Sequence, residues 1–178
     1  MRRSFLVLIL SAFAFVCFAG NATLKTAAQK KDNVRAPFEL KLRFDKEHVY
    51  DQKVLEQPYV QQESVSLFCG DDYGINVKIE NDEIAHITYQ KVTAEADITF
   101  HFWQEVDKDG KQMMMCNIHN NLARKVYIKA VMTIPFKKGT YKTSIMPVEA
   151  GLSGIEIWGA HTIVQMVLYN FRFKGDKE

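Results

Sequence analysis

Short segments rich in β-branched and aromatic residues, separated by turn residues about every ten positions, constrain this chain more than any other feature. In the clearest segment, Phe38, Leu40, Leu42 and Phe44 alternate with charged residues, the period of a half-buried strand. Similar strand-like segments cover residues 65–69, 75–79, 84–92, 98–103, 113–118, 126–134, 143–148, 154–158 and 163–173. We therefore predict an all-β fold, an immunoglobulin-like antiparallel β-sandwich, with a small β-barrel as the alternative.

The breaks between these segments are also predicted from residue type. Residues 70–74 form a cluster of turn-forming residues, and Asn81-Asp82 forms a second turn. Only residues 49–60 and 94–97 offer weak helical alternatives. Segment 163–173 is largely apolar at both alternating sets of positions as far as Leu168, which predicts a central strand.

The loop Asp107-Lys108-Asp109-Gly110 joins two strong strand segments. A three-residue loop with a bulged Gly110 would pair Asp107 with Lys111 and set the whole register. One face of the hairpin would then be apolar and would contain Ile98, Phe100, Phe102, Met114, Cys116 and Ile118. A loop one residue longer or shorter would mix apolar and polar side chains, so we adopt the bulged register.

The opposite face of the same hairpin collects soft side chains: His101, Trp103, Met113, Met115 and His119. Thioether and imidazole groups beside an indole suit Cu(I). In ligand type only, the set resembles the methionine, histidine and tryptophan site of periplasmic copper-binding proteins. Ordinary packing is the alternative, since methionines commonly fill irregular gaps between neighbouring side chains.

A second candidate site lies near the C-terminus. Glu156, Trp158 and His161 could share a pocket rim, with the carboxylate orienting the imidazole, which would suit a hydrolase. The alternative is that Trp158 closes one end of the sandwich and Glu156 pairs with a nearby cation.

The first 22 residues have the pattern of a secretory signal peptide. Arg2 and Arg3 precede an apolar run over residues 5–19, and small residues then offer cleavage points. An uncleaved anchor is the alternative, although the run is shorter than the roughly 20 residues of a spanning helix. We further predict a flexible linker over residues 23–36 and a single β-sandwich domain over 37–178, with no transmembrane segment after cleavage.

Cys69 and Cys116 remain once the leader, with its single cysteine, is removed. Export to the periplasm or the cell exterior would expose them to an oxidising compartment, so we predict a disulfide between them, with two free thiols as the alternative.

Charge argues against nucleic acid as a partner. Removal of Arg2 and Arg3 leaves 21 basic and 21 acidic side chains, so the chain has no excess of cations to neutralise phosphates. We therefore predict an exported, non-catalytic binding or structural module, without a cofactor, that contacts a protein or a small apolar ligand. A copper-binding protein is the first alternative, and a hydrolase the second.

Overall fold

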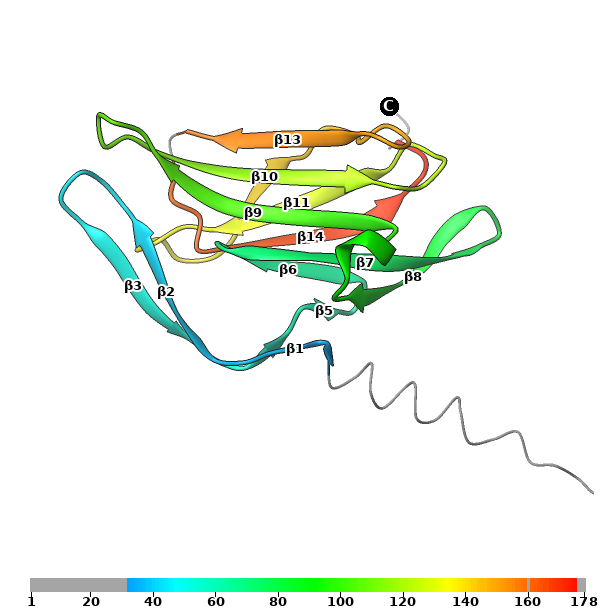
Figure 1. Ribbon diagram of the computed structural model, residues 1–178, viewed down its shortest axis with the longest axis horizontal. Coiled ribbons are helices and arrows are strands. Elements are labelled where there is room, and N and C mark those ends of the chain that lie inside the picture. Colours follow the sequence, from blue (N-terminus) through cyan, green and yellow to red (C-terminus); the bar gives the residue numbers. More distant parts are fainter. Residues whose placement is uncertain (1–31, 160, 176–178) are drawn as a thin grey trace, which may run out of the picture.

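The fold consists of two five-stranded antiparallel sheets, seen in a computed structural model that describes residues 32–159 and 161–175 (Figure 1). The front sheet has the order β13-β10-β9-β7-β8, with bounds Ser153–Trp158, Gln112–Asn120, Ile98–Val106, Asp71–Glu80 and Glu83–Gln90. The back sheet has the order β12-β11-β14-β6-β5, with bounds Tyr141–Ser144, Tyr127–Thr133, Gln165–Arg172, Ser64–Phe68 and Val60–Gln61. The two sheets pack as a sandwich, so this prediction is confirmed and the barrel alternative is wrong.

Four more strands complete the described chain. β2 (Phe38–Arg43) and β3 (Val49–Val54) form a separate hairpin, while β1 (Val34–Arg35) pairs with β4 (Gln57–Pro58). A single 3-10 turn covers Thr93–Glu95. Among the residues described, no helix is long and apolar enough to cross a membrane.

The β9–β10 hairpin has the predicted register. The Asp107 N–H donates to the Lys111 carbonyl at 2.9 Å, and Gly110 has the left-handed φ of 77° that the bulged loop requires. Phe102 consequently lies opposite Cys116, and Phe100 opposite Ile118. The predicted apolar face is buried in the molecule.

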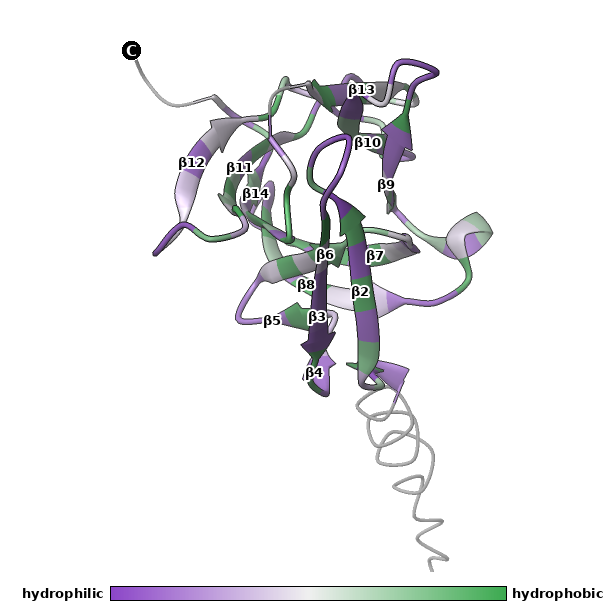
Figure 2. Ribbon diagram, turned by 90° about the vertical axis from the view of Figure 1, so that its left-hand side faces the viewer, coloured by the Kyte–Doolittle hydropathy of each residue, from purple (hydrophilic) through white to green (hydrophobic). Residues whose placement is uncertain are grey.

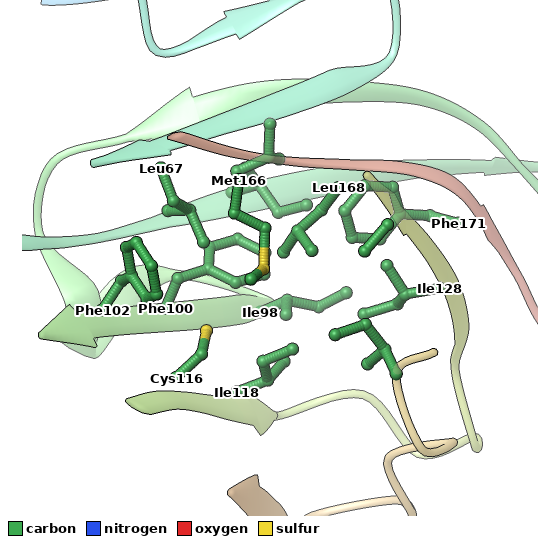
Figure 3. Close-up of a cluster of buried hydrophobic side chains, with 14 of the residues drawn as sticks. Leu67, Ile98, Phe100, Phe102, Cys116, Ile118, Ile128, Met166, Leu168 and Phe171 are labelled. Atoms are coloured by element: carbon green, nitrogen blue, oxygen red, sulfur yellow. The ribbon is translucent and has the colours of Figure 1, made fainter. Parts of the chain in front are cut away.

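The core lies between the two sheets and is filled from both (Figure 3). Phe100 and Phe102 of β9 point toward Met166 of β14 and Leu67 of β6, and all four side chains are fully buried. β14 is the central strand of the back sheet, as the apolar residues at both sets of alternating positions predicted.

Several predicted boundaries are wrong. Most of the turn cluster at residues 70–74 is strand, because β7 begins at Asp71 directly after a tight turn at Gly70. Residues 49–60 form β3, β4 and the start of β5 rather than a helix, since β3 pairs with β2, β4 with β1 and β5 with β6. β12 ends at Ser144, so the predicted strand over residues 143–148 is mostly irregular chain, with one bridge at Val148.

The end of the predicted linker belongs to the fold. Arg35 is only 4% exposed and forms an ion pair with Asp71 at the start of β7. Its guanidinium also lies 4.3 Å from the centre of the Tyr59 ring and 4.8 Å from that of Phe68. The predicted signal peptide and residues 23–31 of the linker lie outside the described residues.

Candidate functional site

The β2–β3 hairpin lies across one end of the sandwich and is anchored there by polar contacts (Figure 1). The Gln104 side chain of β9 accepts from the Arg43 N–H at 2.7 Å and donates to the Arg43 carbonyl at 2.9 Å. The Gln112 amide donates to the Phe44 carbonyl, and the Thr162 hydroxyl donates to that of Arg43. These contacts hold the tip of the hairpin, where β2 meets β3.

The alternation of β2 decides which face of the hairpin turns inward, and its apolar and polar bands are visible in Figure 2. Leu40 and Leu42 are buried, and they form a small second core with Val54, Phe68 and Val164. This second core is separate from the one between the sheets. It fixes the hairpin against the end of the back sheet where β6 ends and β14 begins.

A pocket of about 470 Å³ lies between β3 and that end of the back sheet, and we call it the hairpin pocket. One wall consists of Tyr50, Gln52 and Val54, which alternate along β3 on the face that β2 turns inward. The opposite wall includes Phe68, Ile134 and Val164. Gln52 is exposed although it faces inward, because the pocket lies beneath it. The volume lies within the range of small-molecule sites, about 300–1,000 Å³.

Phe136 occupies an unusual position in the pocket lining. The Lys137 N–H donates to the Ile134 carbonyl at 3.3 Å, closing a turn with Pro135 and Phe136 in its centre. Phe136 has φ +61°, a conformation that costs a bulky residue about 1–2 kcal/mol. Its ring packs edge-on against Phe44 and Tyr50 yet stays 80% exposed. The strained backbone thus holds a large apolar ring at the pocket.

About half of the residues that line the pocket are polar, and most of these are uncharged: Tyr50, Gln52, Gln57, Thr133 and Gln165. The Tyr50 hydroxyl donates to the Gln52 side chain, and Gln165 and Thr133 lie on the opposite wall. Lys53 and Lys137 are the charged lining residues, and no carboxylate lines the pocket. A pocket of mixed apolar and polar lining, with cations and without acids, favours a ligand that carries a negative charge.

The structure brings together part of the predicted metal face on the β9–β10 hairpin. Trp103 lies directly opposite Met115, and the His101 ring is 4.6 Å from the Trp103 ring, centre to centre. Met113 lies two residues from Met115 on the same face and opposite Glu105. His101 also approaches the Asp72 carboxylate at 3.7 Å.

His119 lies apart from this group. Its Nδ1 is 2.9 Å from the Ser153 hydroxyl and its Nε2 is 2.8 Å from the Asn121 side-chain oxygen, so both ring nitrogens already have partners. The described residues contain no cluster of three or more His, Cys, Asp and Glu side chains that could hold a metal ion. Copper binding at this face stays a prediction.

The structure does not join the residues of the predicted C-terminal pocket rim. Glu156 and Trp158 lie on the inward-facing side of β13, where the carboxylate accepts from the Met146 N–H at 2.6 Å and the indole donates to Thr143 at 2.9 Å. His161 is exposed, and the hydrogen bond that the structure shows for the Glu156 carboxylate goes to the Met146 N–H rather than to His161. Trp158 packs against the main core, in line with the packing alternative.

Cys69 and Cys116 are free thiols, so the predicted disulfide is not formed. The reason is β9, which lies between them. Gly70 donates to the Phe102 carbonyl from one side, while Cys116 pairs with Phe102 from the other. Two strand spacings separate such positions by about 10 Å, and a disulfide needs Cα atoms within about 7 Å.

The two thiols are expected to react poorly in the folded protein. Burial raises the pKa of Cys116 to about 12, and burial also raises the pKa of the half-buried Cys69, which lowers the thiolate fraction of both near neutrality. We expect a maleimide reagent at pH 7 to modify Cys69 slowly and Cys116 only after unfolding in urea. Fast labelling of Cys116 without denaturant, or an intact mass lower by two hydrogens, would contradict this.

No local sequence pattern predicts the residues of the hairpin pocket as a site. The alternation from Phe38 to Leu42 signalled the buried face of β2, and the same period continues in Tyr50, Gln52 and Val54. However, these three residues fall in a segment that also fitted a helix, and the opposite wall comes from residues 68–165, which no local pattern connects to β3.

No protein family model, curated protein or solved structure matches this chain.

Proposed function

We propose that this protein is an exported, non-catalytic binding module that holds a small amphipathic anion in the hairpin pocket. The observation that carries the proposal is the lining: apolar side chains beside uncharged polar ones, two lysines, no carboxylate and a volume of about 470 Å³. The leader-like residues 1–22 support export. The neutral balance of charge in the remaining chain favours a small ligand over nucleic acid.

Two exposed side chains further support an apolar ligand. Leu55 is 68% exposed and Phe136 is 80% exposed, and both line the hairpin pocket. Large apolar groups left in water at a concave site are typical of surfaces that a ligand covers. The backbone strain at Phe136 also supports a ligand site, since strained residues cluster at active sites and ligand-binding positions.

The chemistry of the pocket suggests how the ligand would lie. A hydrocarbon segment would pack between the wall of Phe68, Ile134 and Val164 and the side chains of β3. Its anionic group would remain near Lys137 at the edge, where a charge keeps its hydration.

Octanoate and octanol provide a test of this arrangement, because they share a chain of the same length and differ in charge. We expect octanoate to bind more tightly than octanol by about tenfold, the effect of about 1.4 kcal/mol from one charge interaction. Titration calorimetry with the purified protein measures both. The Lys137→Gln variant should lose this difference, while its affinity for octanol stays the same.

Two substitutions on β3 form a matched pair for the location of the site. Gln52→Trp fills the hairpin pocket from its inward-facing wall and should abolish octanoate binding. Asp51→Trp places the same ring on the opposite, exposed face of the strand and should leave binding unchanged. Equal binding by both variants would overturn the proposed site, and a shared loss with intact circular dichroism would do the same.

A further inference from the structure

One edge of the sandwich is unprotected, and we propose that it pairs with the same edge of a second copy of this chain. This edge is β13, the outermost strand of the front sheet (Figure 1). Its six residues pair with β10 on one side. On the other side, none of the described residues makes a main-chain hydrogen bond to it. A free row of N–H and C=O groups is a template for pairing with another strand.

The other three edges of the sandwich are protected in different ways. At β8, the Glu63 carboxylate accepts from the Ile87 N–H at 2.6 Å and contacts His86, which occupies the edge. β5 consists of only two residues. β12 is four residues long and carries the exposed Lys142. Short strands, charges and lysine side chains are the usual means of blocking edge pairing. β13 is six residues long, has no lysine, and carries one carboxylate, Glu156, which accepts from the Met146 N–H.

The exposed surface around β13 is apolar. Ile155 is 59% exposed and Ile157 is 57% exposed, and both lie on the outer face of the front sheet, with Ile157 opposite Met115 of β10. Met146 and Leu152, close to this strand in the chain, are 73% and 57% exposed. Exposed apolar groups gathered at one place are typical of a protein interface.

The near-absence of charge on this edge fits an identical copy as the partner. Two identical edges carry the same charges, which repel each other when the strands pair. A strand that pairs with its own copy must therefore be nearly uncharged. The sequence contains no lysine or arginine from residue 143 to residue 171. The only charged residue of β13 is Glu156, which faces inward and accepts from the Met146 N–H. Nothing on this edge therefore repels a second copy.

The residue order of β13 selects the register of the pair. Antiparallel pairing about a two-fold axis at Ile155 places Ile155 against Ile155 of the partner subunit. Glu156 then lies opposite Gly154 of the partner subunit, which has no side chain. An axis at Glu156 would instead place two carboxylates directly opposite each other, which is unfavourable. The interface is small, so we expect a dimer with a dissociation constant of micromolar order.

Sedimentation equilibrium of the purified protein, from about 1 µM to about 1 mM, tests the proposal. We expect the monomer mass at the lowest concentration and twice that mass at the highest. Ile155→Lys should weaken association at least tenfold, because two lysines then face each other. Ile79→Lys makes the same change at an isoleucine that is 48% exposed on β7, and it should leave the dimer unchanged.

A charge-reversal mixture tests the register. Ile155→Lys and Ile155→Glu should each be monomeric alone and should associate when mixed in equal amounts. A wild-type chain that stays monomeric at all concentrations overturns the proposal. The pairing partner of β13 would then be a strand of another protein. Equal weakening by Ile79→Lys, or a dimer that persists in Ile155→Lys, also overturns it. Failure of the mixture to associate overturns the register.

Discussion

The Arg35→Met variant is expected to lose about 3–5 kcal/mol of unfolding free energy, because it leaves the Asp71 carboxylate buried without its cation. Asp71 Oδ2 accepts from the Arg35 guanidinium and, at 2.7 Å, from the Phe68 N–H. Arg35 also donates to the Ser66 carbonyl at 3.1 Å. One side chain thus ties β1 to the turn between β6 and β7.

The double variant Arg35→Met with Asp71→Leu is the control for this prediction. Removing both charges leaves no uncompensated ion, so the double variant should regain most of the lost stability. Two guanidinium nitrogens of Arg35, Nε and Nη1, are buried without a partner, which means that the native pair itself carries a desolvation cost. Urea denaturation measures all three proteins, and a double variant less stable than Arg35→Met would contradict the prediction.

The stability deficit of Arg35→Met should depend on pH. Burial raises the pKa of Asp71, and the neighbouring Arg35 opposes that rise. Without Arg35, the folded-state pKa rises further above the unfolded value, so the folded state takes up a proton more readily. Stability of the variant relative to wild type should therefore increase as the pH falls from 7 toward that folded-state pKa. A deficit that grows on mild acidification would contradict this sign.

Alanine substitution at Phe100 and at Phe136 should reduce the stability of the fold to very different extents. Phe100→Ala is expected to destabilise the fold by about 3–5 kcal/mol, because it removes a fully buried ring and leaves a cavity between the sheets. Phe136→Ala removes a ring that is 80% exposed, so we expect less than about 1 kcal/mol of destabilisation. Octanoate binding should decrease in Phe136→Ala because this ring lines the hairpin pocket.

Phe136→Gly separates the backbone strain from the role of the ring. Glycine adopts a positive φ without penalty, so this variant should be at least as stable as Phe136→Ala while binding octanoate equally poorly. Urea denaturation and titration calorimetry measure the two quantities. If Phe136→Gly lost as much stability as Phe100→Ala, the Phe136 ring would be part of the core, which would contradict its role as an exposed lining residue of the hairpin pocket.

Local sequence patterns sufficed for much of the sandwich. The loop at Asp107–Gly110 and the alternation on either side of it predicted the β9–β10 register residue by residue. Two physical facts explain this success: side chains alternate with period two, and a register shift of one residue would bury His101 among phenylalanines. The turn at Asn81-Asp82 succeeded for a related reason, since both residues tolerate the positive φ observed there.

The hairpin pocket and the buried pair of Arg35 and Asp71 could not be predicted in the same way. Each depends on residues separated by tens of positions that meet only after β1, β2 and β3 fold onto the end of the sandwich. The sequence around Arg35 is polar, which predicts a linker. Its role depends on the rings of Tyr59 and Phe68, which no local period connects to it.

The amino-acid sequence alone determined the class of fold, the faces of the main hairpin and the central place of β14, because these follow from short-range alternation and burial of apolar side chains. Only the tertiary structure decided that Cys69 and Cys116 stay apart, that the Glu156 carboxylate accepts from the Met146 N–H, and that β13 lacks an edge partner among the described residues. These outcomes depend on which strands become neighbours, and strand order is set by packing of the whole chain.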